Sequence, residues 1–184
     1  MKQRPNLIQL AKEVYEANKA KGFHASPISN DTLLMLVITE VSEAIEADRK
    51  GRRTNPFDLA WAESTADYCH LFEEHFPTKI KDTVEDELAD AVIRLLDLAG
   101  YRNIPTLTPK ALGWYNKALC GTFCENIFHL TRSFIRTSDL RIIIPMLIRG
   151  IEDLCKQMSI DLWYHVELKL EYNKTRPQRH GKAY

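Results

Sequence analysis

Two pairs of acidic residues in this sequence have the spacing that places both carboxylates on one side of a helix. Glu40 and Glu43 belong to the segment VITEVSEAIEADRKG, and Glu87 and Asp90 belong to ELADAVIRLLDLAG. Residues three apart in a helix are neighbours on its surface. At about 100° per residue, Glu40 falls in the middle of the apolar stripe of its segment, and Glu87 and Asp90 fall beside the stripe of theirs. The spacing therefore predicts two helices that each direct an acid pair toward the interior.

Four carboxylates inside a helical bundle require a positive charge nearby, because buried like charges repel and lose their hydration at a cost of several kcal/mol each. A bound divalent cation would supply that charge. Mg²⁺ prefers hard oxygen ligands and is commonly shared between protein carboxylates and substrate phosphates. We therefore expect a Mg²⁺ site at the four acids, with Mn²⁺ as a substitute. The alternative is that the acids lie on solvated faces or pair with Arg49, Arg94 and Lys169.

The elements that must position these residues have helical periodicity along the whole chain. Only seven glycines occur, and the stretches between Pro, Gly and Asn repeat their apolar residues with a helical rather than an alternating period. We expect one all-α domain over 1–184, a bundle of about six to seven helices. Pro77 should end the third helix, Gly100 should close the fourth, and Pro145 should kink the sixth or move its start. The expected helices are 6–21, 30–50, 57–76, 83–100, 108–136, 138–157 and 160–176.

The composition, with 45% hydrophobic and 27% charged residues, is that of an ordinary soluble protein. The 25 basic and 25 acidic residues give a net charge of zero, which argues against a general nucleic-acid binder. No apolar run approaches the ~20 residues of a membrane span, and the start lacks the features of a signal peptide. We expect a cytoplasmic protein with neither a membrane nor a nucleic-acid polymer as partner. The apolar segments in 123–158 exceed what one small bundle can hide, which predicts a homodimer.

The order of the motifs resembles a known enzyme family. Glu40-x-x-Glu43 followed by Glu87-x-x-Asp90 is similar to the ExxE…ExxD signature of the MazG-like all-α nucleoside triphosphate pyrophosphohydrolases. NLIQLAKEVYEANKAKGF resembles the first helix of that family, with Phe23 where an aromatic residue often follows the glycine. KLEYNKTRPQRHGKAY resembles the C-terminal K-x-x-x-N-x-x-R segment and HGK tail of phage-like and small bacterial members. The resemblance covers about 1–50, 83–104 and 160–184.

The chain departs from the family pattern in two long segments. Residues 52–82 widen the gap between the two acidic motifs, and residues 105–157 separate the second motif from the last helix. We interpret both segments as helical insertions into one domain. Thr39 also occupies a position where many members have a further acid. The insertions leave the metal ligands in order, but they put the identity of the substrate in doubt.

The resemblance implies Mg²⁺-dependent hydrolysis of a ribo- or deoxyribonucleoside triphosphate to the monophosphate and pyrophosphate, in nucleotide pool control or housecleaning. It implies that the four acids hold the metal and that Glu40 or Glu43 also orients or deprotonates the attacking water. Such a reaction depends on charge neutralisation and an aligned nucleophile. Cations should therefore converge on the polyphosphate. Arg94 lies one turn after Asp90, where it could instead neutralise Asp90 or Asp97. The expected substrate-binding residues are Arg94, Lys169, Asn173, Arg176 and Lys182.

Two other classes of protein fit parts of the pattern. A di-iron carboxylate bundle also places acids on facing helices, but it needs an ExxH motif on two of them. This chain offers only Asp67-x-x-His70. A non-catalytic helical interaction module is the second alternative, in which the inward acids meet basic residues of a partner chain.

Overall fold

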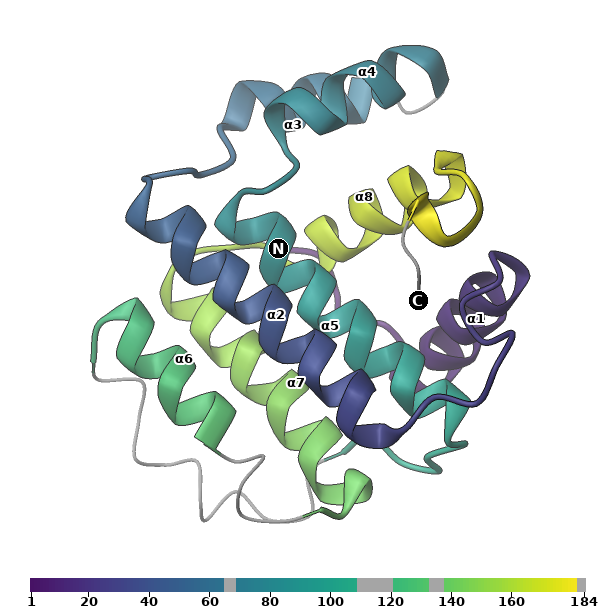
Figure 1. Ribbon diagram of the computed structural model, residues 1–184. Coiled ribbons are helices and arrows are strands. Elements are labelled where there is room, and N and C mark those ends of the chain that lie inside the picture. The colour runs from purple at the N-terminus through teal and green to yellow at the C-terminus, as the bar shows by residue number, and fades with distance from the viewer. Residues whose placement is uncertain (65–68, 109–120, 133–137, 182–184) are drawn as a thin grey trace.

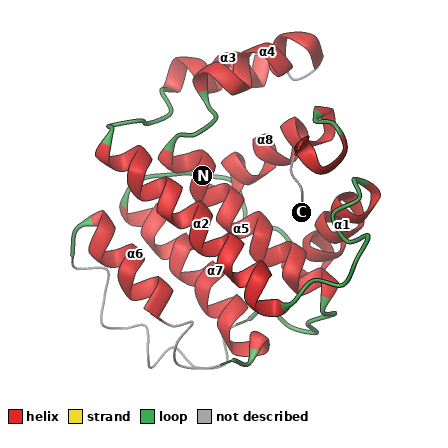
Figure 2. Cartoon of the chain, viewed as in Figure 1, coloured by secondary structure: helices red, strands yellow, loops and turns green. Residues whose placement is uncertain are grey.

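The computed structural model describes residues 1–184 except 65–68, 109–120, 133–137 and 182–184. The described residues form eight α-helices and contain no strand, which confirms the all-α bundle and adds one helix to the expected number (Figure 2). No helix in this part of the chain is both long enough and apolar enough to cross a lipid bilayer. The helices are α1 (Leu7–Ala20), α2 (Asn30–Arg49), α3 (Pro56–Ser64), α4 (Cys69–Lys79), α5 (Val84–Tyr101), α6 (Phe123–Thr131), α7 (Leu140–Gln157) and α8 (Leu162–Thr175), followed by the 3₁₀ turn η2 (Gln178–Gly181).

Helix α5 is the centre of the bundle, and α1, α2, α7 and α8 all pack against it (Figure 1). The side chain of Thr83 caps its N-terminus by accepting a hydrogen bond from the Asp86 amide, as the sequence predicts for Asp82 or Thr83. Three acids follow in the first turn, where the helix dipole favours negative charge. Because neighbours surround α5, residues on every side of it are buried, including four of its acids: Glu85, Asp86, Glu87 and Asp97.

Gly100 does not close α5, contrary to the expectation from sequence, because the helix continues to Tyr101 and Arg102 is its C-cap. The glycine serves instead to bring two helices together. A Cβ atom at this position would lie 2.3 Å from the carbonyl oxygen of Ala11 and 2.6 Å from the Cβ of Tyr15. Helix α1 therefore approaches α5 at a distance that only a residue without a side chain allows.

The expected single helix over 57–76 is wrong. Helices α3 and α4 pack against each other, and the rings of Trp61 and His75 have centroids 4.0 Å apart. In one continuous helix, fourteen residues would separate these side chains by about 21 Å along the axis. Pro77 does not end α4, which runs on to Lys79.

The hairpin of α3 and α4 is fixed to α8 by a small apolar cluster of its own. Phe76 is fully buried and stacks on Tyr172 of α8, with ring centroids 4.4 Å apart. Leu168 of α8 completes the buried cluster with Ala62, Phe72 and Ile80. Helices α3 and α4 make up most of the segment 52–82. This segment therefore packs on α8, the helix that also carries Lys169.

The expected continuous helix over 108–136 is also wrong, because the chain leaves helical geometry at Gly121 and Thr122. Thr122 and Glu125 then form a capping box that starts α6. The sequence predicts Ser138 or Asp139 as the start of the next helix, and Asp139 caps α7, so Pro145 lies inside that helix and does not move its start. For the last helix the sequence predicts Ser159 as the cap and Pro177 as the stop. Helix α8 instead begins at the cap Asp161, and it ends before Pro177 as predicted.

Candidate metal centre

Three of the four predicted metal ligands converge where α2 crosses α5. One carboxylate oxygen from each of Glu40, Glu87 and Asp90 lies within 4.8 Å of the other two. Glu40 and Glu87 are buried, while the side chain of Asp90 is 21% exposed. The group is therefore closed toward the core and open at the Asp90 side.

Glu43, the fourth predicted ligand, lies one turn after Glu40 on α2 and is exposed. It does not belong to the group of three, although its charge contributes to raising the pKa of both Glu40 and Glu87.

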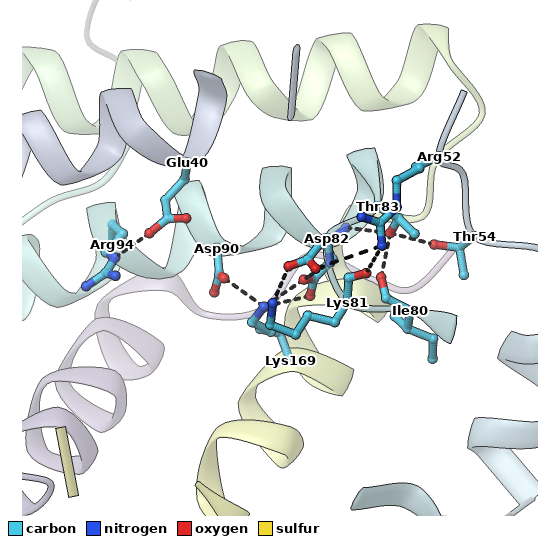
Figure 3. Close-up of polar contacts among 11 residues, drawn as sticks. Glu40, Arg52, Thr54, Ile80, Lys81, Asp82, Thr83, Asp90, Arg94 and Lys169 are labelled. Carbon is cyan, nitrogen blue, oxygen red and sulfur yellow. Dashed lines mark hydrogen bonds and ion pairs between the residues drawn. The ribbon is translucent and has the colours of Figure 1, made fainter. Parts of the chain in front are cut away.

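Two cations neutralise part of the cluster (Figure 3). The guanidinium Nε of Arg94 donates to Glu40 at 2.9 Å. The Lys169 ammonium, with a side chain only 2% exposed, lies 2.7 Å from a carboxylate oxygen of Asp90 and 2.7 Å from one of Asp86. Both cations were predicted to bind substrate, and in the structure both are engaged by carboxylates. Contact of either one with substrate stays a prediction.

Of the acids in this region, Glu87 has the pKa that is raised most. Burial, followed by repulsion from Asp86 and Asp90, raises the pKa of Glu87 to about 9. Burial also raises the pKa of Asp86 to about 6, although Lys169 opposes the shift. Burial and the neighbouring Asp90 raise the pKa of Glu40, again against the effect of its cation, Arg94. The charges of Asp90 and Asp86 outweigh burial at Lys169 and raise its pKa.

The donor set fits a hard divalent cation. Among the described residues, no hydrogen bond or ion pair connects the Glu87 carboxylate to any other group, whereas Glu40, Asp86 and Asp90 each have a cationic partner. The carboxylate cluster consists of five acids and two cations, which are Glu40, Glu43, Asp86, Glu87 and Asp90 with Arg94 and Lys169. When all five acids are ionised, the cluster has an excess of three negative charges. All of its ligand atoms are carboxylate oxygens, the type that Mg²⁺ prefers.

The remaining predicted substrate residues lie at the C-terminal end of α8 or beyond it. Asn173 follows Lys169 by one turn, and its side-chain amide makes no hydrogen bond to any described residue. The backbone carbonyl of Arg176 accepts a hydrogen bond from the Lys21 ammonium, and the Arg176 guanidinium lies over the ring of Tyr172. Lys182 lies outside the described residues.

Asp86 is the residue of the cluster that sequence reasoning missed. A helical wheel with one apolar stripe places it away from the interior, but α5 has no solvent face at this point. Its spacing of four residues from Asp90, another acid on the same side of the helix, is the signal that could have indicated it. Asp97, two turns beyond Asp90, is similarly buried, and both of its carboxylate oxygens contact His24 Nε2, at 3.0 and 3.1 Å.

No histidine contributes to the metal-ligand group among the described residues, so the ExxH ligands of a di-iron centre are not found there. Asp67 and the side chain of His70 lie outside the described residues. Comparison with protein-family models, curated proteins and solved structures found no match to this chain. Its function is therefore inferred from the residues of the site.

Proposed function

We propose that this chain is a Mg²⁺-dependent hydrolase that converts a ribo- or deoxyribonucleoside triphosphate to the monophosphate and pyrophosphate. The observation that carries the proposal is the carboxylate cluster between α2 and α5, in which the acids outnumber the cations and Glu87 forms no ion pair with any described residue. A bound Mg²⁺ would neutralise the polyphosphate and orient it for attack. Glu40, Glu87 and Asp90 would hold the ion, and Glu43 would complete its ligands from the solvent side.

The described residues suggest separate roles for the two glutamates of α2. Glu40 is buried and already accepts a hydrogen bond from Arg94, which fixes its position. Glu43 is exposed and makes no hydrogen bond or ion pair with any described residue, so its carboxylate is available to orient a water molecule and accept its proton. In this proposal Glu43 activates the water and Glu40 is chiefly a ligand.

Arg94 and Lys169 would act mainly by holding the ligands in place. Each forms a charge-assisted hydrogen bond to a carboxylate of the cluster, and such bonds are stronger than neutral ones. The open side of the group is the side of Asp90 and Arg94, whose side chains are 21% and 20% exposed. The phosphates would approach from there, where the Arg94 guanidinium is within reach.

Nucleotide hydrolysis can be tested with a panel of ribo- and deoxyribonucleoside triphosphates, assayed with Mg²⁺ and with a chelator. We expect monophosphate and pyrophosphate from one or a few substrates, and a loss of at least roughly 100-fold in Glu43→Gln. Glu46→Gln is the matched control, because Glu46 lies one turn further along α2, is exposed, and pairs with Arg49 and Lys50. Diphosphate plus phosphate as products, or no turnover by folded protein, would contradict the proposal.

One observation favours a second candidate, a non-catalytic interaction module. The ion pairs of Arg94 with Glu40 and of Lys169 with Asp86 and Asp90 are those of a structural network. Thermal stability that responds neither to Mg²⁺ nor to nucleotide would favour this candidate.

A homodimer is proposed under either function, and the exposed Phe128 of α6 and Ile142 of α7 are apolar side chains available for its interface.

A further inference from the structure

Helices α1 and α8 both pack on α5 (Figure 1). A groove of about 400 Å³ is lined by residues of these two helices and of the N-terminal segment. Its walls are apolar, formed by Val14 and Ala17 on one side and by Trp163, Val166 and Leu170 on the other. This volume lies in the range of small-molecule sites, which are mostly apolar with a few polar groups. At one end the Lys21 ammonium donates to the carbonyl of Lys174 at 2.8 Å, which ties the ends of the two helices together.

Two amide side chains, Asn18 from α1 and Asn173 from α8, are the neutral hydrogen-bonding groups on the facing helices of this groove. The Oδ1 atom of Asn173 is buried without a donor, and the amide is not held by any described residue. An unsatisfied buried acceptor is unfavourable. Rotation of the Asn173 side chain into the groove would offer both its acceptor and its donor to a ligand. A planar heterocycle with N–H and C=O or ring-nitrogen groups on one edge complements a slot of this kind.

The groove shares helix α8 with the carboxylate cluster, because Asn173 lines the groove and Lys169 belongs to the cluster. Asn173 follows Lys169 by four residues, about 6 Å along the helix axis, and the Lys169 ammonium contacts Asp90. A sugar and triphosphate chain can bridge that separation, with its phosphates at the acids and its base in the groove. Three lysines and three glutamates also line the groove, so its charged residues balance: Lys2, Lys21 and Lys174, with Glu13, Glu167 and Glu171. Lys2 pairs with Glu167 and Lys174 with Glu171, which suits a neutral group such as a nucleobase.

We infer that the groove between α1 and α8 is the subsite for the nucleobase of the substrate, and that Asn173 and Asn18 read the edge of the base. This inference rests on the proposed function and assigns base selectivity to residues outside the metal cluster. The stacking surface is Trp163, whose indole lines the same groove.

The decisive variant is Ala17→Trp, because Ala17 is exposed on α1 and lines the groove, so a large side chain there fills the subsite without disturbing the core. Ala20→Trp is the matched control, an exposed alanine of the same helix outside the groove. We expect Ala17→Trp to raise KM at least roughly tenfold with little change in kcat, the pattern of lost uniform binding. Asn173→Leu should keep the stability of the fold and reduce the selectivity between bases. Mg²⁺-induced stabilisation should be the same as in the wild type in all three variants.

A second readout is independent of metal and turnover. Nucleosides added without Mg²⁺ should shift the side-chain amide signals of Asn173 and Asn18 in NMR spectra, and Ala17→Trp but not Ala20→Trp should remove these shifts. Wild-type turnover with an unchanged KM in Ala17→Trp would overturn the groove assignment and leave the proposed function standing. Absence of nucleoside shifts in the wild type would overturn the assignment whatever turnover shows. Dissociation of an oligomer by Ala17→Trp alone would identify the groove as an interface between copies and would also overturn it.

Discussion

Replacing Glu87 with Gln should stabilise the metal-free protein and abolish its response to Mg²⁺. The pKa of Glu87 is raised to about 9 from the usual 4.5, so the folded state retains a proton that the unfolded state releases above pH 4.5. The stability of the wild type should therefore fall as pH rises from about 4.5 to about 9, the window between these two pKa values. At pH 7 the limiting cost is about 1.4 kcal/mol for each of the 2.5 pH units above 4.5, or about 3.5 kcal/mol.

Relaxation and partial solvation reduce that limit, so we expect Glu87→Gln to gain about 1–2 kcal/mol at pH 7 without metal. Mg²⁺ at 100 times its Kd should add about 2.7 kcal/mol to the wild type and nothing measurable to the variant. Urea unfolding at pH 5, 7 and 8.5, with and without Mg²⁺, measures both effects. Glu46→Gln is the control on the exposed face of α2, and its unfolding midpoint should follow the wild type. A less stable Glu87→Gln that still responds to Mg²⁺ would refute the reasoning.

Two further substitutions test other parts of the structure. Lys169→Met should destabilise the fold by about 3–5 kcal/mol because it leaves Asp86 and Asp90 without their buried cation, and adding Asp86→Asn should recover part of that loss in chemical denaturation. The same stability with and without Lys169 would contradict the buried network. Gly100→Ala should cost about 2–3 kcal/mol, since its Cβ would overlap the Ala11 carbonyl at 2.3 Å. Gly51→Asn is its control, at a positive φ with no atom near the added Cβ, and should change the melting temperature little.

The sequence was sufficient to place the helices with strong local end signals. The caps Ser29, Thr83 and Asp139 are side chains that satisfy free amides at helix starts, and Pro177 cannot continue α8. These effects are local, so they can be identified without knowledge of the fold. The same is true of the i, i+3 spacing that places Glu87 and Asp90 on one side of α5.

What could not be predicted depends on contacts between distant segments. Helix α4 is held against α8 by the packing of Phe76 on Tyr172, and Gly100 is required by the approach of α1 to α5. Neither contact has a signature in the local sequence. Asp86 was missed for a related reason, because a wheel with one buried face cannot represent a helix that is packed on all sides.

The imbalance of charge is the property that separates a metal site from a structural ion-pair network. Arg94 matches Glu40, and Lys169 bridges Asp86 and Asp90, so these pairs could hold the helices together without a metal. Glu87 fits no such role, because it is buried, has a pKa raised by burial and by its acidic neighbours, and forms no ion pair with any described residue. A glutamine of nearly the same shape would serve packing equally well at less cost. We therefore propose that the carboxylate at this position binds a cation that the chain itself does not supply.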